Sequence, residues 1–208
     1  MESSEVYKSY IKDIDMNKMK LALLVAGALV AGASTSALAA DESQGTVTFT
    51  GKLITETCTI TSQVDQLVAL DSVSIKTLDS KGAEGGFKTF DIDVNCPKTP
   101  SEFSTVGVHF EPVGKTTSWD SSTGNLNNAF DPAEPGNTGK TAAGNVQIKI
   151  YNTNDGARTH AEIGKVSKYL TPDADGNASF SYAGGYYATA ATTAGEVFAR
   201  VQYTLVYQ

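Results

Sequence analysis

The sequence has 208 residues, a formal net charge of −7 at pH 7 and only 19% charged side chains. This length fits one or two domains, and an acidic chain has no electrostatic attraction for nucleic acid or for anionic lipid. The low charge content is more typical of strands and tight turns than of charged surface helices.

The first 39 residues have the pattern of a secretory signal peptide. Two lysines precede an apolar run, small residues follow, and Ala37-Leu38-Ala39 fits a cleavage site. A transmembrane span would need about 20 mainly apolar residues, whereas glycines interrupt this run. We therefore expect residues 1–39 to be removed on export. We also expect translation to begin at Met16 or Met19, because residues 1–15 place mixed charge ahead of the basic segment.

Cys58 and Cys96 are the two cysteines of the chain, and both follow the cleavage site. An exported protein with two cysteines is expected to pair them. The alternatives are two free thiols or a pair of metal ligands, but neither cysteine has a second ligand at Cys-x-x-Cys or Cys-x-x-His spacing. A disulfide here would constrain the unfolded chain by about 4 kcal/mol in the loop-entropy model.

Strict alternation of polar and apolar residues begins soon after the cleavage site. Such alternation is the pattern of a strand with one buried face. The residues that share one face are Gly45, Val47, Phe49, Gly51 and Leu53. This strand would form the N-terminus of the exported chain, where a segment frays unless it packs against something.

Further strands follow in chain order, separated by turn signals rich in Gly, Asp, Asn and Pro. The expected strands are residues 56–60, 67–76, 86–96, 105–113, 145–151, 177–183, 185–190 and 196–207. The last is expected to be the longest, with its odd-numbered apolar residues in phase. Residues 118–143 are expected to form a long surface excursion with room for a short strand. Many short strands spaced by turns predict a single all-β sandwich.

The sequence carries no pattern for catalysis or for a bound cofactor. His109 and His160 are its two histidines, and neither has a nearby cysteine or histidine at ligand spacing. No nucleophile elbow, zinc-protease motif or phosphate loop is present. Residues 172–180 contain two aspartates, but an EF-hand loop that begins at Asp173 would need Gly at position six and Glu at position twelve, where this chain has Ala178 and Gly184, so we expect a turn there. We therefore expect no enzyme activity, no metal and no cofactor.

Several features coincide with one known family. An N-terminal arm with the alternation Gly-x-Val-x-Phe-x-Gly follows the signal peptide, and the two cysteines come next at a spacing of 38 residues. The chain ends on a strand with a penultimate tyrosine, Tyr207, and Gly195 lies fourteenth from the C-terminus. In these features the chain resembles the major structural subunits of type 1-like fimbriae, which the chaperone–usher pathway of Gram-negative bacteria assembles.

The resemblance implies an incomplete immunoglobulin-like β-sandwich. Subunits of this family lack the final strand of the sandwich, which leaves an apolar groove beside the C-terminal strand. The N-terminal arm of the next subunit fills that groove as a donor strand, and repetition makes a fibre. The implied segments are a signal peptide at 1–39, a donor-strand arm at 40–52 and a pilin domain at 53–208.

The resemblance also assigns individual residues. The donor-strand positions are Gly45, Val47, Phe49 and Gly51, with the first of them in a shallow pocket. The positions on the acceptor and chaperone-facing edge are Gly195, Val197, Ala199, Val201, Tyr203, Leu205 and Tyr207. Cys58 and Cys96 match the subunit disulfide of the family.

Partners and location are implied in the same way. The expected partners are further copies of the subunit in a head-to-tail polymer, a periplasmic fimbrial chaperone and an outer-membrane usher, and no nucleic acid. The expected location is a fimbrium on the cell surface, reached through the periplasm, where the fibre serves cell adhesion. The physics agrees, because an unpaired sheet edge is a template for an added strand, and a head-to-tail contact that does not close makes a filament.

Three alternatives stay open at this point. A minor adapter or terminator subunit of the same organelle would share most of the pattern, although a terminator would lack a competent arm or groove. A secreted carbohydrate-binding sandwich would use exposed aromatic side chains, for which Trp119 and the tyrosines at 186–187 are the candidates. The third alternative is a closed monomeric sandwich in which residues 45–53 form the first strand of their own domain.

Overall fold

The computed structural model describes residues 46–208, except 56, 99–101 and 115–117. Contacts divide the chain into two units, 1–50 and 51–208. The second unit, called the body below, contains every strand found in the described residues. Residues 46–50 form neither strand nor helix. The expected signal peptide and Gly45 lie outside the described residues.

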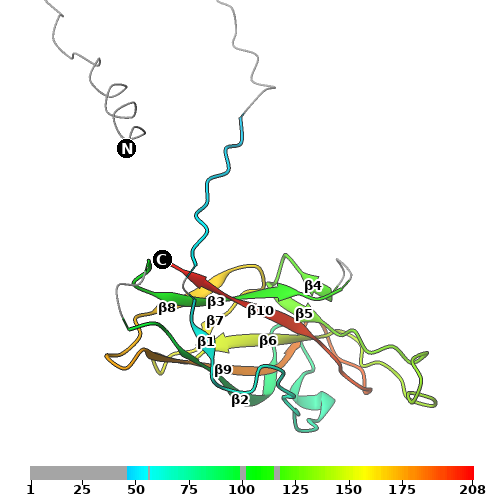
Figure 1. Cartoon of the computed structure of the whole chain (residues 1–208). Helices are drawn as coiled ribbons and strands as arrows, with labels where there is room; N and C mark the ends of the chain where they lie inside the picture. Colours follow the sequence, from blue (N-terminus) through cyan, green and yellow to red (C-terminus); the bar gives the residue numbers. More distant parts are fainter. Residues whose placement is uncertain (1–45, 56, 99–101, 115–117) are drawn as a thin grey trace, which may run out of the picture. The chain divides into compact units, whose positions relative to one another are not determined.

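The body is built from two antiparallel sheets (Figure 1). The larger sheet contains β1 Thr59–Ile60, β2 Glu84–Asn95, β4 Trp119–Asp120, β5 Asn125–Asn127, β6 Val146–Asn152, β7 Thr159–His160 and β9 Asn177–Ala188. The smaller sheet contains β3 Val106–Pro112, β8 Val166–Leu170 and β10 Val201–Tyr207. The strand orders are β1-β2-β9-β6-β5-β4, with β7 also paired to β6, and β10-β3-β8. The 3₁₀ turn η1 comprises Ile75–Thr77.

The core lies between the two sheets, where alternate residues of each strand point inward. The larger sheet contributes Ile92 from β2 and both Phe180 and Tyr182 from β9, and each of these side chains is fully buried. The smaller sheet contributes Val108 and Phe110 from β3. The ring of Tyr182 packs edge-on against the ring of Phe110, with centroids 5.0 Å apart. The all-β sandwich predicted from the alternation is therefore confirmed.

One expected strand is absent from the structure, and two others are joined into one. Within the expected strand 67–76, residues 67–74 form coil that leads into η1, and Leu67 is 93% exposed, because no neighbouring strand pairs with this segment. Residues 177–188 form one continuous strand instead of two. Gly185 does not break β9, because the ring of Phe87 lies directly over it, and a Cβ there would come within 2.5 Å of that ring.

The C-terminal strand is shorter than expected. It begins at Val201 instead of residue 196, and β2 and β9, with 12 residues each, are longer than its 7 residues. The reason lies in its neighbour: β3 ends at Pro112, which pairs with Val201 and has no N–H to continue the ladder. Within residues 118–143 the structure has two short strands, β4 and β5, followed by an exposed loop. No helix among the described residues has the length and apolarity needed to cross a membrane.

The predicted disulfide between Cys58 and Cys96 is present. It joins the residue before β1 to the residue after β2, and the two strands pair through Thr59 and Asn95. The N–H of Cys96 also donates to the carbonyl of Gly176, at 2.7 Å, which ties the bridge to the turn before β9. The disulfide thus fixes the first strand of the body to its neighbour.

Removing both cysteines with Cys58→Ser and Cys96→Ser is expected to lower the free energy of unfolding by about 4 kcal/mol, because a loop of about 39 residues is no longer closed in the unfolded chain. Urea unfolding of the exported protein, followed by tyrosine fluorescence, measures this change. The wild type in reducing agent is the matched control and should lose the same amount. A reduced wild type as stable as the oxidised protein would contradict the prediction.

Candidate interface along the β10 edge

The C-terminal strand β10 lies at the edge of the smaller sheet. It pairs with β3 along its whole length, and no other strand of the described residues pairs with its second edge. Gln208 and Thr105 exchange both of their main-chain hydrogen bonds, at 3.0 Å each. Because such pairs alternate along an antiparallel ladder, the main-chain groups of residues 202, 204 and 206 face β3. Those of residues 201, 203, 205 and 207 face the open edge.

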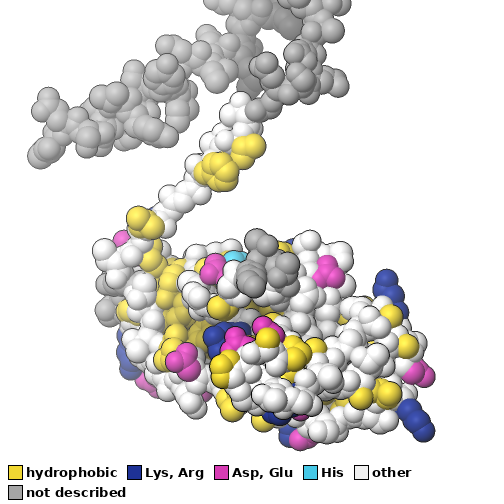
Figure 2. Space-filling view, turned by 90° about the vertical axis from the view of Figure 1, so that its right-hand side faces the viewer, with side chains coloured by type: hydrophobic (Ala, Val, Ile, Leu, Met, Phe, Trp, Pro, Cys, Tyr) yellow, Lys and Arg dark blue, Asp and Glu magenta, His cyan; other side chains and the backbone are white. Residues whose placement is uncertain are grey.

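The same odd-numbered residues point their side chains toward the core. Val201, Tyr203, Leu205 and Tyr207 pack against the core but remain half-buried, whereas Gln202 and Thr204 are exposed. Figure 2 shows hydrophobic side chains gathered on part of the surface of the body. An apolar strip beside an unpaired row of N–H and C=O groups is a surface that can accept an added strand.

Residues 58–64 lie across the strip from β10. The hydroxyl of Tyr207 accepts a hydrogen bond from the N–H of Cys58, at 3.1 Å. The hydroxyl of Tyr203 donates to the carbonyl of Val64, also at 3.1 Å. Burial raises the pKa of Tyr203, and the carboxylate of Asp65 raises it further. Tyr203 therefore stays neutral at physiological pH, and the two hydroxyl groups fix the segment after the disulfide to β10.

The predicted donor residues lie in a segment with no partner among the described residues. Val47 is 77% exposed and Phe49 is 91% exposed. Gly51 is also exposed, and a Cβ built on it meets nothing within 4 Å. Exposed large apolar side chains on an extended segment are costly in water and favour burial in a partner. The structure brings the predicted acceptor residues of β10 together and leaves the arm without a strand partner.

Gly195, Val197 and Ala199 lie before β10 and belong to no strand. The side chains of Val197 and Ala199 are half-buried, so they continue the alternation of β10. Gly195 is exposed and packs against the main chain of a distant loop, where a Cβ would come within 2.4 Å of the nitrogen of Ala143. The next residue, Glu196, forms an isolated parallel bridge with Ala142. Glycine is thus required at 195 by the close approach of two segments.

Gly195→Ala is expected to lower the free energy of unfolding by roughly 1–3 kcal/mol, because the added methyl group overlaps main-chain atoms that cannot rotate away. Urea unfolding of the exported protein measures the loss. Gly85→Ala is the matched control, since a Cβ at Gly85 meets nothing within 4 Å. Equal losses in the two variants would show that the contact with residues 142–143 is not the cause.

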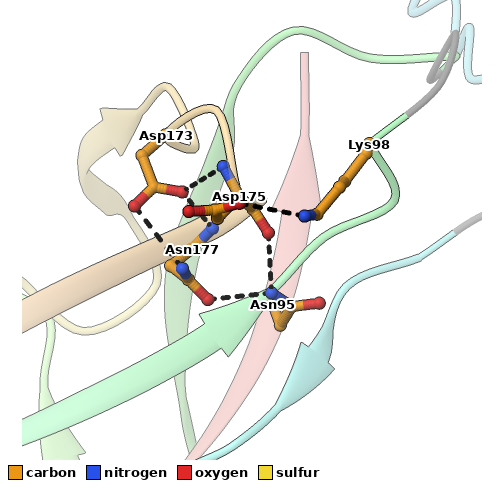
Figure 3. A network of polar contacts seen from close by, with 5 residues as sticks. All are labelled: Asn95, Lys98, Asp173, Asp175 and Asn177. Carbon is orange, nitrogen blue, oxygen red and sulfur yellow. Dashed lines mark hydrogen bonds and ion pairs between the residues drawn. The ribbon is translucent and has the colours of Figure 1, made fainter.

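The aspartate-rich segment before β9 forms a turn, as the sequence predicts (Figure 3). One carboxylate oxygen of Asp173 accepts hydrogen bonds from the N–H groups of Asp175 and Asn177, at 2.9 and 2.8 Å. The bond from Asn177 is the main cause that lowers the pKa of Asp173. Asp175 pairs with Lys98 at 3.0 Å, and Asn95 donates to Asn177 at 2.8 Å. The carboxylate of Asp173 therefore closes the turn, and that of Asp175 is paired with a lysine outside it.

Within the described residues, no group of three or more metal-ligating side chains comes together. Trp119 packs against the core, and among residues 46–208 the exposed large hydrophobic side chains of the described part include no tryptophan or tyrosine. Tyr186 and Tyr187 are half-buried, and Tyr187 lies beneath the ammonium group of Lys149, which is 5.1 Å from its ring centre. The described surface therefore offers no aromatic platform of the kind that sugar-binding modules use.

The sequence of this body matches a known protein family over almost all of the described residues. The model of the family described as "Fimbrial protein" matches residues 47–208. The chain belongs to the fimbrial protein family. The matched region contains both cysteines, the apolar strip of β10 and residues 47–52 of the predicted donor arm.

Curated relatives of this fimbrial protein match over nearly their full length. The F17 fimbrial protein of Escherichia coli is 35% identical over 191 residues, which cover 88% of this chain and 97% of the relative. The major fimbrial subunit SMF-1 of Stenotrophomonas maltophilia K279a is 36% identical over 177 residues, covering 82% and 96%. The laminin-binding fimbrial subunit ElfA of Escherichia coli O157:H7 is 30% identical over 196 residues, covering 91% and 99%.

Solved structures show the same fold. A chain from a chaperone–usher pilus, solved to explain the uncoiling of its rod, superposes with a TM-score of 0.52 at 22% identity and covers 80% of this chain and 97% of that one. The P pilus rod subunit PapA superposes with a TM-score of 0.51 at 20% identity, covering 73% and 99%. The fold of this fimbrial protein is therefore the incomplete immunoglobulin-like sandwich of chaperone–usher pilins.

One residue of the interface region gave no signal in the sequence. Asn128 lies in the polar stretch that was expected to be a surface excursion, and its side-chain amide binds the main chain of the segment before β10. Its nitrogen donates to the carbonyls of Ala143 and Glu196, both at 2.9 Å. Its oxygen accepts from the N–H groups of Phe130 and Phe198, at 3.1 and 3.0 Å. The partners from 143 onward are distant in sequence, so local pattern could not identify them.

Proposed function

We propose that this fimbrial protein is a shaft-forming pilin that polymerises by donor-strand exchange. Residues 40–52 of one copy add as a strand to the open edge of β10 in the next copy. The observation that carries the proposal is the edge itself. The odd-numbered residues from 201 to 207, whose N–H and C=O groups have no partner among the described residues, all have half-buried side chains that pack against the core.

The arm is chemically suited to this edge. An added strand would pair the free main-chain groups of β10 and cover its apolar strip. Burying an exposed phenylalanine such as Phe49 is worth about 1.5–3 kcal/mol, and Val47 adds a similar amount. Because the arm and the edge belong to different parts of the same chain, the contact is head to tail and extends into an open filament.

The same edge would be exposed in any subunit that has not yet joined a fibre. An unpaired strand beside an apolar strip is prone to aggregation. We therefore propose that a periplasmic chaperone lends a strand to β10 and that an outer-membrane usher receives the complex. The proposed segments are a signal peptide at 1–39, an arm at 40–52 and a pilin domain at 53–208. The division of contacts after Thr50 supports an arm separate from the body.

A major role in the shaft is favoured over an adapter or terminator role. One relative is named a major fimbrial subunit, and this chain has both an apolar arm and an open edge. Another relative is named a laminin-binding fimbrial subunit, so laminin is a rational first ligand to test on the purified fibre. The closed monomeric sandwich is disfavoured because Val47 and Phe49 are exposed and form no strand.

Electron microscopy of cells that express the fimbrial locus tests the proposal. Deleting this chain should remove the long fibres, and the full chain supplied in trans should restore them. A chain that lacks residues 42–52 but keeps its cleavage site should be exported and yet fail to restore the fibres. Fibres that persist after deletion, with altered number or length, would indicate a minor subunit instead.

A further inference from the structure

The open edge of the subunit extends beyond the first residue of β10, toward the preceding segment. β3 stops at Pro112, so the segment that precedes Val201 has no partner strand. Phe198 nevertheless has both of its main-chain groups paired. Its N–H donates to the side-chain oxygen of Asn128, at 3.0 Å. Its carbonyl accepts from the N–H of Ala129, at 2.7 Å. Asn128 and Ala129 therefore take the place that a longer β3 would have.

This pairing sets the direction of the neighbouring main-chain groups. In an extended segment, residues two apart point their N–H and C=O groups to the same side. Phe198 therefore has the orientation of the even-numbered residues of β10, and Val197 and Ala199 have that of Val201. No described residue forms a main-chain hydrogen bond with Val197 or Ala199. Their side chains are half-buried, while those of Phe198 and Arg200 are exposed.

The length of the edge decides how much of an arm it can hold. The alternating segment 45–53 has nine residues and spans about 30 Å as a strand, at about 3.3 Å per residue. β10 has 7 residues and spans about 23 Å. Extending the edge back to Val197 adds four residues and gives about 36 Å. β10 alone is therefore shorter than the alternating arm, and the extended edge is long enough.

We propose that Asn128 is a positioning residue that extends the acceptor edge from 201–207 to 197–207, so that the whole alternating arm of a second copy is held. This inference rests on the proposed function. The side chain does not touch the arm. It acts by fixing Phe198, and the two bonds to the carbonyls of Ala143 and Glu196 fix Asn128 in turn.

The test compares arm peptides of different lengths. The acceptor is the full exported chain carrying Phe49→Asp, refolded with a synthetic peptide of residues 45–53, or with the shorter peptides 45–51 and 47–53. The measured quantity is the dissociation half-time of each peptide. In this acceptor the long peptide should dissociate more slowly than either short one. Adding Asn128→Ala should shorten the half-time of the long peptide about tenfold, because contacts to Val197 and Ala199 are lost.

A matched control comes from the other sheet. Asn154 also uses its side-chain amide to bind main chain, donating to the carbonyl of Ser179 at 2.7 Å and accepting from the N–H of Ser181 at 3.1 Å. Asn154→Ala should leave unchanged the ratio of the dissociation half-time of the long peptide to that of the short peptides. Phe198→Pro removes the N–H that Asn128 binds, and it should reduce the ratio as Asn128→Ala does, which keeps the test valid if one variant fails to fold.

Two outcomes would overturn the inference, and they are distinguishable. If Asn128→Ala speeds the dissociation of all three peptides by one common factor, Asn128 supports the body only and does not extend the edge. If no peptide binds the acceptor that carries Phe49→Asp alone, the proposed donor-strand function fails, and this inference fails with it.

Discussion

Phe49→Asp is expected to abolish fibre assembly while the subunit itself still folds. The side chain of Phe49 is 91% exposed and lies outside the body, so the change removes no core contact of the subunit. In the fibre, the same position would place a carboxylate against the apolar strip of the next copy. An unpaired buried charge costs several kcal/mol, and each 1.4 kcal/mol reduces an equilibrium constant tenfold. The expected loss of polymer is therefore a hundredfold or more.

Co-purification with the periplasmic chaperone and gel analysis of unheated fibres measure the two halves of this prediction. The yield of chaperone-bound subunit should stay near that of the wild type, and the ladder of fibre fragments should disappear. Thr48→Asp is the matched control and should leave the fibres intact, because Thr48 is also exposed and is a polar position of the alternation, between Val47 and Phe49. If Phe49→Asp destroys the folded subunit, the arm belongs to its own domain, and a closed monomeric sandwich replaces the fibre model.

The strands that alternation predicts correctly are those with one buried face. In β3, Val106, Val108 and Phe110 are fully buried in the core, and His109 between them is only half-buried, so the sequence pattern follows the burial there. Gly107 is buried as well, because the side chains of Val166 and Tyr169 lie against it. Residues 67–76 have a similar composition, yet they form no strand. A β-branched, apolar segment becomes a strand only if a neighbour supplies hydrogen bonds, and composition does not report the neighbour.

Buried polar side chains are a second reason why some strands could not be predicted from the sequence. β5 has three residues, and its Asn125 is buried together with Gln147 of β6, to which it donates at 3.0 Å. Asparagine and glutamine are usually found on the surface, so the sequence does not distinguish a buried pair of amides from exposed ones. For this reason β5 lies within residues 118–143, for which the sequence predicts a surface excursion. The contact of Gly195 with residues 142–143 was equally invisible. Resemblance indicated that glycine matters there, but the reason is a long-range approach of two main chains.

Leu205→Asp is expected to have the opposite effect to Phe49→Asp, because β10 belongs to the subunit's own sandwich. Leu205 pairs with Val108 across the ladder and packs against the core. Its replacement loses about 1.5–3 kcal/mol of apolar burial and places a carboxylate beside the core at a cost of a few kcal/mol more. The sum is a large share of the 5–15 kcal/mol that stabilises a typical domain. The unfolded fraction should rise by a thousandfold or more.

The neighbouring residue, Thr204, provides a control that separates the effect of burying a charge from the effect of adding one. Thr204 lies on the same strand but is exposed, and it pairs with His109 on the outer face of the sheet. Thr204→Asp therefore adds the same charge without burying it. Chaperone-bound subunit should be depleted and proteolysed in Leu205→Asp cells and retained in Thr204→Asp cells, as immunoblots of periplasmic extracts would show. Equal depletion would mean that β10 tolerates no charge on either face, whereas normal levels of both variants would mean that β10 is dispensable for the fold. The fibre model requires the first variant to fail at folding and the Phe49→Asp variant to fail only at assembly, because one side chain completes its own body and the other completes its neighbour's.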